Sequence, residues 1–276
     1  MSTANLQLTE PGCVVRATAA RKGRTPWMTP QTSSLSYLNY GRIILAAGDS
    51  PLRFATGDKE TGLICLAGKG TVRLSDSSSF ELGLYDALYI PRDFEVEVVP
   101  SAEGCDFAEI SAPVDQSYPV QFVSYAAVQQ DPGLHFKAGG EASARTLNIL
   151  IGKNVQAGRI VAGVTFSEPG NWTSWPPHEH AAILEEAYLF IDMPAPSWGI
   201  QFVYTDAKDP ELVVPVRQDD CVAMPKGYHP NVAAPGGCIN FLWMMAAHRE
   251  LEDRKFGVVN VQPEYAAAKS GLEKGR

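Results

Sequence analysis

Short apolar or alternating runs recur along the whole chain, and glycine, proline, aspartate or asparagine bounds most of them. Alternation with a period of two between such turn residues is typical of β-strands. Residues 263–274 are instead rich in alanine and lysine and predict a helical, loosely docked tail. The pattern as a whole predicts an all-β protein. The expected strands are residues 43–46, 63–66, 71–74, 88–90, 96–99, 120–125, 147–151, 160–166, 187–191, 201–204, 212–216, 221–224 and 239–245.

Two segments of the chain resemble each other and indicate an internal repeat. Residues 86–95 (DALYIPRDFE) align without gaps on residues 220–229 (DCVAMPKGYH), and residues 60–65 match residues 186–191 more weakly. The repeat predicts two β-domains of similar size in tandem. We expect a first domain over 1–140, a second over 141–262 and a polar tail over 263–276, with the polar stretch 137–144 as the linker.

The composition excludes several classes of protein. The chain has 276 residues, with 23 basic against 31 acidic ones, a formal net charge of −8 and no long block of Lys or Arg, so no nucleic-acid partner is expected. No apolar run approaches the roughly 20 residues of a membrane-spanning helix, and residues 1–10 lack the pattern of a signal peptide. The five cysteines are widely spaced and form no CxxC pair. We therefore expect reduced thiols, a cytoplasmic location and no membrane partner.

The histidines are few and unevenly placed. Of the five in the chain, His178 and His180 lie in one hexapeptide, and His229 follows a Pro-x-Gly turn. On an extended strand residues i and i+2 project from the same face, so His178 and His180 would present two imidazoles side by side. Neutral imidazole is a common ligand of divalent metals. A carboxylate from Glu185 or Glu186, on the next expected strand, would complete a site of three imidazoles and one carboxylate.

Strand parity distinguishes the two glutamates. Glu186 shares a face with Tyr188 and other large aromatic residues that are able to line a pocket, whereas Glu185 lies on the opposite face. Glu186 is therefore the expected ligand and Glu185 the fallback. His135 and His248 have no partners nearby in the sequence, and we expect both to be structural.

The pattern of HxH, a glutamate five or six residues later and PxGxH after a further strand resembles the two motifs of the cupins. Cupins are small β-barrels with a metal at the mouth, so the resemblance implies that the repeat is a bicupin. In the N-terminal copy Glu95 stands in the place of His229, and residues 53–55 lack the histidine pair. The first domain is therefore expected to bind no metal and to have a structural role.

A closer resemblance surrounds these motifs. Residues 170–180 (GNWTSWPPHEH), 184–188 (LEEAY), 201–206 (QFVYTD) and 225–230 (PKGYHP) resemble the 5-deoxy-glucuronate isomerase family of inositol catabolism, which is related to the 5-keto-4-deoxyuronate isomerases of pectin breakdown. The resemblance implies aldose–ketose isomerisation of a six-carbon sugar acid, with 5-deoxy-glucuronate converted to 2-deoxy-5-keto-gluconate. It also implies one divalent ion, zinc or manganese with iron and nickel left open. The implied ligands are His178, His180, Glu186 and His229.

Such an isomerase moves a proton between adjacent carbons, and a divalent ion stabilises the negative charge on the carbonyl oxygen as a Lewis acid. The base stays open between Glu185, Tyr204 and a metal-bound hydroxide, because proton transfer depends first on hydrogen-bond reach. Lys226 is a further candidate catalytic residue, on the turn that precedes His229. A hydride shift between the carbons also stays open.

Two departures from the family bear on the substrate. The loop between His180 and Leu184 is several residues shorter than expected, and Phe202 stands where the family carries an arginine. If that arginine holds the substrate carboxylate, another cation must replace it here. The candidates are Lys226, Arg217 and Arg159.

Two other functions fit the same ligands. One is a mononuclear iron or manganese cupin that acts as an oxygenase or lyase, and the other is a sugar-binding cupin without catalysis. The match outside the ligands, at residues 170–175 and 201–206, favours the isomerase. A small sugar acid is then the expected partner. An exposed strand edge on either barrel would also allow a homo-oligomer.

Overall fold

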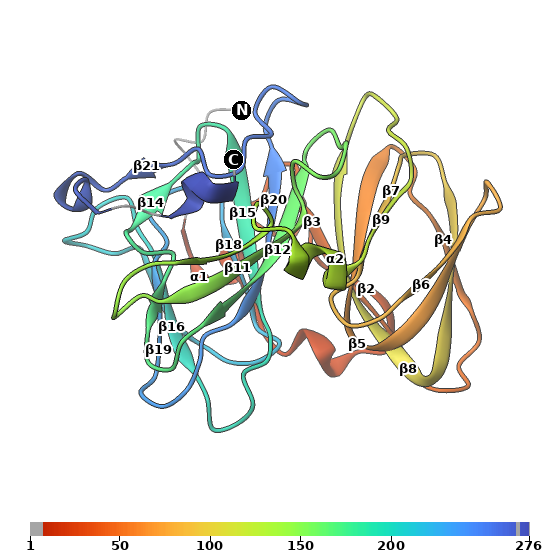
Figure 1. Ribbon diagram of the computed structural model, residues 1–276, viewed down its shortest axis with the longest axis horizontal. Coiled ribbons are helices and arrows are strands. Elements are labelled where there is room, and N and C mark those ends of the chain that lie inside the picture. Colours follow the sequence, from red (N-terminus) through yellow and green to blue (C-terminus); the bar gives the residue numbers. More distant parts are fainter. Residues whose placement is uncertain (1–7, 269–270, 276) are drawn as a thin grey trace.

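The structure is a computed structural model that describes residues 8–268 and 271–275. Two β-barrels lie side by side, the first built from the N-terminal half of the chain and the second from the C-terminal half (Figure 1). The α-helices of the described chain are short, α1 (Glu10–Cys13) and α2 (Tyr125–Gln130). No helix in these residues is long and apolar enough to cross a membrane. The predicted all-β class with two tandem barrels is confirmed.

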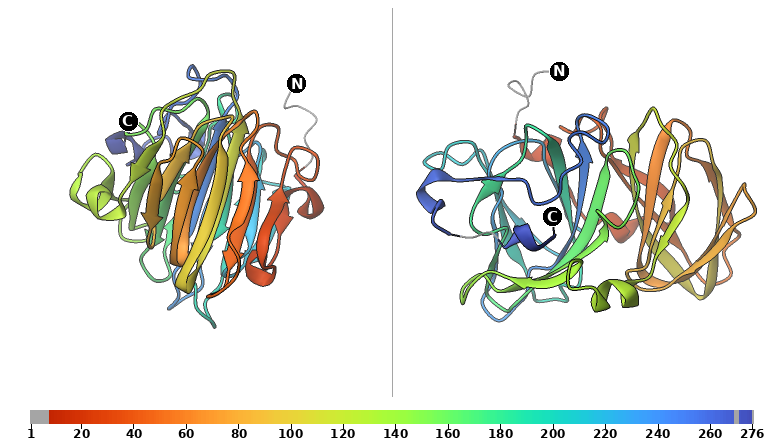
Figure 2. Two further views of the ribbon diagram at one scale, coloured as in Figure 1. Left: turned by 90° about the vertical axis from the view of Figure 1, so that its right-hand side faces the viewer. Right: turned by 45° about the horizontal axis from the view of Figure 1, so that its top comes forward.

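The first barrel is an eight-stranded sheet in which β5 (Lys59–Leu74) and β8 (Glu95–Pro113) pair along most of their length. Register shifts on either side of Gly68 are irregularities at which the strands bend. For this reason the apolar pattern predicts two strands, 63–66 and 71–74, where the structure has one. The other strands are β2 (Gly23–Met28), β3 (Asn39–Leu45), β4 (Leu52–Ala55), β6 (Ser79–Leu82), β7 (Ala87–Ile90) and β9 (Gln121–Val123). The left panel of Figure 2 looks onto this barrel from its outer end.

The second barrel has a seven-stranded sheet facing a four-stranded one, with a two-stranded ribbon at its mouth. The seven-stranded sheet is β1 (Val14–Val15), β18 (Cys221–Met224), β15 (Leu184–Phe190), β20 (Phe241–Ala247), β12 (Ile160–Ser167), β11 (Arg145–Ile151) and β10 (His135–Ala138), in that order. The four-stranded sheet is β13 (Trp172–Thr173), β19 (Asn231–Ala233), β16 (Gly199–Val203) and β17 (Leu212–Val216). The ribbon pairs β14 (His178–Glu179) with β21 (Asn260–Val261).

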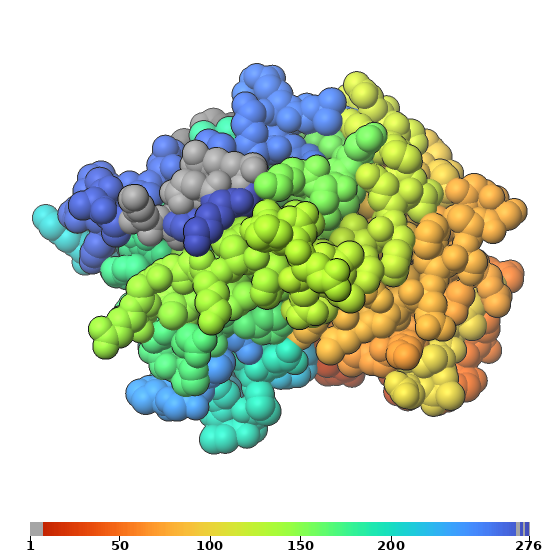
Figure 3. All heavy atoms as spheres, viewed as in Figure 1, coloured from red at the N-terminus to blue at the C-terminus, as the bar shows by residue number. Residues whose placement is uncertain are grey.

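Two strands of the seven-stranded sheet of the second barrel come from residues 1–140, the region expected to form the first domain. β1 pairs with β18, and β10 pairs with β11. The sheets therefore divide the chain before the polar stretch 137–144, because the chain has already crossed to the second barrel at β10. Figure 3 shows the part of the chain that includes α2 and β10, in yellow-green, passing across the front of the molecule from one barrel to the other.

The tail expected to be helical, 263–276, contains two 3₁₀ turns in its described part, η3 (Pro263–Tyr265) and η4 (Leu272–Gly275). Residues 269–270 and 276 of that tail lie outside the described residues. Leu272 is buried, so this turn is docked rather than loose. The right panel of Figure 2 shows it against the second barrel.

A buried carboxylate joins the first barrel to the second. Glu60, at the start of β5, accepts hydrogen bonds from the main-chain N–H groups of Gly158, Arg159 and Ile160 at 2.7, 2.6 and 2.7 Å. Tyr89 donates a fourth hydrogen bond through its hydroxyl at 2.7 Å. Hydrogen bonds to a charged group contribute about 1.5–3 kcal/mol each. Glu60 therefore fixes the start of β12, a central strand of the second barrel.

Candidate metal centre

Three side chains meet at the mouth of the second barrel. His180 follows β14, Glu186 lies on β15 between β18 and β20, and His229 follows the turn after β18. Each offers one ligand atom, and these atoms all lie within 4.8 Å of one another. His178 is the neighbour of this cluster, with its ring centroid 5.0 Å from that of His229. All four side chains are buried.

Main-chain carbonyls orient all three imidazoles. The Nδ1 atoms of His178, His180 and His229 lie 2.9, 3.0 and 2.9 Å from the carbonyl oxygens of Pro176, Leu184 and Gly227. A carbonyl only accepts, so each Nδ1 carries a proton, and in the neutral imidazole Nε2 then has a free lone pair. This arrangement is typical of metal-ligating histidines.

Two of these Nε2 atoms face the same carboxylate oxygen. His180 Nε2 and His229 Nε2 lie 3.0 and 3.1 Å from Glu186 Oε2. His229 Nε2 is buried and makes no hydrogen bond within the described chain. A nitrogen lone pair that points at a carboxylate oxygen is repelled by that oxygen unless a proton or a metal ion lies between the two atoms. The residues therefore fit a divalent cation, for which a set of nitrogen and carboxylate oxygen donors is usual.

The electrostatics of the cluster agree with this fit. Burial and the nearby His229 lower the pKa of His178 to about 3, so its imidazole is neutral. Burial alone would raise the pKa of Glu186, but His180 and His229, when a proton takes the place of the cation on Nε2, outweigh it and lower that pKa to about 2. The carboxylate therefore stays ionised, and metal binding does not require its deprotonation.

Glu185 does not reach this site. Its carboxylate points to the other face of β15 and accepts the N–H groups of Ser36, Tyr37 and Leu38 at 2.7, 2.6 and 2.5 Å. This geometry argues against Glu185 both as one of the alternatives for the base and as the fallback ligand. Its contacts resemble those of Glu60, because each carboxylate caps main-chain N–H groups of the other half of the molecule.

Tyr204 and Lys226 do not line the cavity beside the cluster. The Tyr204 hydroxyl donates to Gln262 Oε1 at 2.7 Å, and Gln262 N–H donates to the carbonyl of Pro177, next to His178. Through Gln262, Tyr204 therefore supports the ribbon of β14 and β21, which carries His178. Lys226 makes no hydrogen bond or ion pair within the described residues. The structure supports neither as a group that touches the substrate.

The other cationic candidates are also placed elsewhere. Arg159 donates to the carbonyls of Pro113, Ala247 and His248 and lies over the ring of Tyr37, at the junction of the barrels. Arg217 is an exposed residue that follows β17.

The two departures from the family pattern have structural explanations. Phe202 stacks on Trp172, with ring centroids 5.8 Å apart, and does not line the cavity. The short loop after His180 is a tight turn, in which Ile183 and Leu184 both donate to the carbonyl of His180. This turn brings the Leu184 carbonyl to His180 Nδ1, so the loop length sets the orientation of a proposed ligand.

A small cavity of about 40 Å³ adjoins the cluster. His178, Glu186 and Tyr188 line it together with Arg145, which is buried and donates to the carbonyls of Ser143 and Trp175. Burial lowers the pKa of Arg145 to about 10, so the guanidinium remains charged at neutral pH. Arg145 is not among the candidate residues that the sequence predicts. Arg145 is two residues before Leu147, so on an extended strand its charged side chain shares the inward face with that apolar residue. A charged residue at such a position could have indicated a functional role.

Comparison with known proteins adds to this geometry. A model of the KduI/IolB family matches residues 13–263. The chain belongs to the KduI/IolB family. Relatives of this KduI/IolB chain include a 5-deoxy-glucuronate isomerase of Geobacillus kaustophilus, 29% identical over 78% of this chain and 81% of that protein. Another, of Bacillus subtilis strain 168, is 28% identical over 78% of this chain and 82% of its own length.

Solved structures resemble the fold of this KduI/IolB chain. An IolB-like protein from Salmonella typhimurium has a TM-score of 0.81 at 23% identity, covering 92% of this chain and 98% of that one. A mutant of Bacillus subtilis oxalate decarboxylase has a TM-score of 0.57 at 12% identity, covering 81% and 73%. These likenesses concern the fold alone.

Proposed function

We propose that the chain is a metal-dependent aldose–ketose isomerase of a six-carbon sugar acid, and that it converts 5-deoxy-glucuronate to 2-deoxy-5-keto-gluconate. The convergence of His180 Nε2 and His229 Nε2 on Glu186 Oε2 carries this proposal, because it fits a cation in a pocket beside a buried arginine. Curated members of the same family are named 5-deoxy-glucuronate isomerase.

His178, His180, Glu186 and His229 are the proposed ligands. A bound divalent ion supplies a Lewis acid for the negative charge that develops on the substrate oxygens. Zinc or manganese suits the donor set best, and iron and nickel stay open.

The other groups in the cavity have roles of their own. Arg145 is placed to receive the substrate carboxylate, because a guanidinium matches a carboxylate in charge and shape. Tyr188 holds a proton there, since its hydroxyl lies 2.7 Å from Ser174 Oγ and burial raises its pKa well above the usual value. Tyr188 therefore replaces Glu185 as the candidate that donates or relays a proton.

The free thiols support the predicted cytoplasmic location. Four of the five cysteines are buried and the fifth, Cys238, is half-buried, and none is in a disulfide. A homo-oligomer stays a prediction from exposed strand edges.

Turnover in deuterated water tests this function. Protein of measured metal content is incubated with 5-deoxy-glucuronate and the products are followed by NMR, beside the variants His180→Ala and His135→Gln. We expect conversion by the wild type and by His135→Gln, which changes a histidine bonded to Asn148 away from the cavity, and none by His180→Ala. Deuterium at the new carbon indicates proton transfer through solvent-exchangeable groups rather than a hydride shift.

Two outcomes contradict the proposal. Absence of conversion by protein with stoichiometric metal rules out the named substrate. Consumption of oxygen by the iron-loaded protein favours the oxygenase alternative instead.

A further inference from the structure

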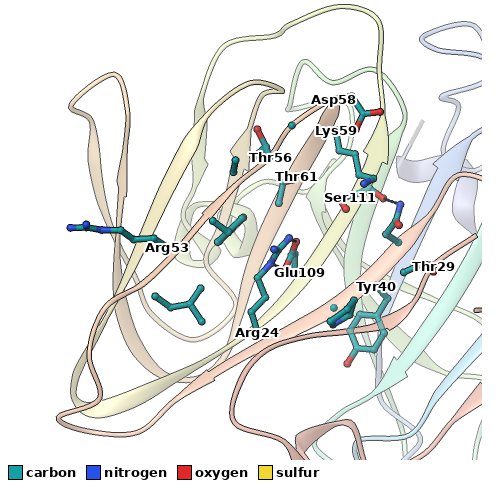
Figure 4. A pocket seen from close by; sticks show the side chains of 17 residues that line it. Arg24, Thr29, Tyr40, Arg53, Thr56, Asp58, Lys59, Thr61, Glu109 and Ser111 are labelled. Carbon is teal, nitrogen blue, oxygen red and sulfur yellow. Dashed lines mark hydrogen bonds and ion pairs between the residues drawn. The ribbon is translucent and has the colours of Figure 1, made fainter. Parts of the chain in front are cut away.

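The first barrel has a cavity of about 590 Å³ in its mouth, bounded by β2, β3, β4, β5 and β8 (Figure 4). Strand register shows where it lies relative to the metal centre. Thr61 pairs with Ile90 on β7, as Glu186 pairs with Met224 on β18, and the internal repeat aligns Ile90 with Met224. Thr61, which lines the cavity, therefore occupies the position of the carboxylate ligand, and the weaker sequence match of residues 60–65 with 186–191 is out of register by one residue. The first barrel therefore has a pocket in the place where the second has its candidate metal ligands.

Several polar groups face this cavity without partners. Lys59, Thr61 and Ser111 lie on the interior face of β5 and β8, which Leu63 and Phe107 continue into the apolar core. Lys59 Nζ, Thr61 Oγ1 and Ser111 Oγ make no hydrogen bond or ion pair within the described part of the chain. Thr61 and Ser111 are 2% and 6% exposed. Because both side chains line the cavity, their hydroxyls are open to it and available to a ligand.

A fixed ion pair forms the centre of the same cavity. Arg24 Nε and Nη2 both donate to the Glu109 carboxylate at 2.7 Å, and the guanidinium lies over the ring of Phe54. Figure 4 shows this pair in the middle of the pocket, with Lys59, Thr61 and Ser111 toward one end. Arg24 neutralises Glu109 and still has its Nη1 group to donate. Lys59 is then a positive charge without a partner in the pocket.

The charges at the rim do not cancel Lys59. Arg53 points away from the pocket and is paired with Glu97 (Figure 4). Asp58 is exposed, so solvent and salt screen its charge. The pocket interior is therefore locally positive in a chain whose formal net charge is −8.

We propose that the first barrel is a second, metal-free binding site for a small polyhydroxylated carboxylate of sugar-acid size. Lys59 Nζ and Arg24 Nη1 would receive the carboxylate, and Thr61 and Ser111 would bond the sugar hydroxyls. The volume lies within the range of small-molecule pockets, about 300–1,000 Å³. This site goes beyond the proposed isomerase and replaces the purely structural role expected for the first domain.

Binding of D-glucuronate tests the site separately from catalysis. The titration, by calorimetry, uses metal-free protein carrying Glu186→Gln, so that the second barrel lacks both the metal and the carboxylate ligand. We expect saturable binding at one site and at least about tenfold weaker binding of neutral D-glucose, because a charge-assisted hydrogen bond is lost.

Variants on the same background locate the site. Lys59→Met is expected to weaken D-glucuronate binding by about tenfold or more, and the isosteric Thr61→Val several-fold. Lys69→Met is the matched control, because Lys69 is an exposed lysine on the same strand and outside the pocket. Circular dichroism confirms that each variant is folded.

Absence of saturable binding, or equal affinity in Lys59→Met and Lys69→Met, overturns the proposal. Equal binding of D-glucose contradicts the assignment of an acidic ligand. None of these outcomes depends on isomerase activity.

Discussion

At the scale of single residues, the identity of the candidate metal site follows from which face of a strand each side chain occupies. Glu185 and Glu186 are adjacent and chemically identical, yet one caps main-chain N–H groups and the other faces two imidazoles. Strand parity is a local property, so the sequence alone favours Glu186 over Glu185 as the proposed ligand. The partners of Glu185 are residues 36–38, far away in the chain, and no local pattern reveals them.

Replacing each glutamate separately tests whether Glu185 stabilises the fold and Glu186 binds the metal. We expect Glu186→Gln to weaken metal binding by at least about 100-fold and to leave the protein folded, because it removes a charged ligand. Glu185→Gln is expected to keep the metal but to lower the free energy of unfolding by about 2–4 kcal/mol, because its amide cannot accept three N–H groups. Metal analysis and urea denaturation measure the two effects. Loss of metal in Glu185→Gln with normal stability is the result that contradicts this assignment.

At the scale of elements, the alternating pattern located most strands but not their lengths. Residues 96–99 begin β8, which continues to Pro113 through a stretch that the pattern does not mark. Register shifts in a long strand interrupt the alternation, so one element reads as several. The prediction of a helical tail was wrong over its described part, which contains two 3₁₀ turns. Its composition favours a helix, but Gly275 seats the chain against Ile149 and Phe256, where a Cβ atom would lie 2.7 Å from each side chain.

The docked tail borders the cavity beside the candidate metal centre. Leu272 on η4 forms part of its wall, and the cavity of about 40 Å³ has room for only a few waters. A six-carbon sugar acid needs more space, so we expect this turn to move during binding. Leu272→Ala should then lower KM and speed removal of the bound metal by a chelator several-fold.

Leu84→Ala, at an exposed leucine of the first barrel, is the control for that experiment. Chelation is followed by absorbance of the chelator complex. Unchanged KM and chelation rate in Leu272→Ala would mean that the substrate enters by another route.

At the scale of the whole molecule, the two barrels are interdependent. β1 from the N-terminal region completes a sheet of the second barrel, and buried carboxylates cross the junction in both directions, from Glu60 and from Glu185. The repeat in the sequence predicted two barrels, because each copy keeps its own apolar strands. It did not predict the crossing strand, since β1 is two residues long and carries no distinctive pattern.

Interdependence predicts cooperative unfolding. Glu60→Ala leaves three main-chain N–H groups at the start of β12 without their acceptor, and we expect a loss of about 2–4 kcal/mol in the free energy of unfolding. Hydrogen exchange at increasing urea should show both barrels losing protection together and at lower urea than in the wild type. Glu81→Ala, at an exposed glutamate on β6, serves as the control. Loss of protection confined to one barrel contradicts this account.

The proposed metal ligands are His178, His180, Glu186 and His229, at the mouth of the second barrel. Anomalous diffraction from a crystal of the metal-loaded protein, recorded at the absorption edge of the bound metal, tests this assignment most directly. We predict a single strong peak about 2.0–2.2 Å from Nε2 of each ligating histidine and from an oxygen of Glu186. A peak at any other cluster, or none at this one in protein with stoichiometric metal, would contradict the account.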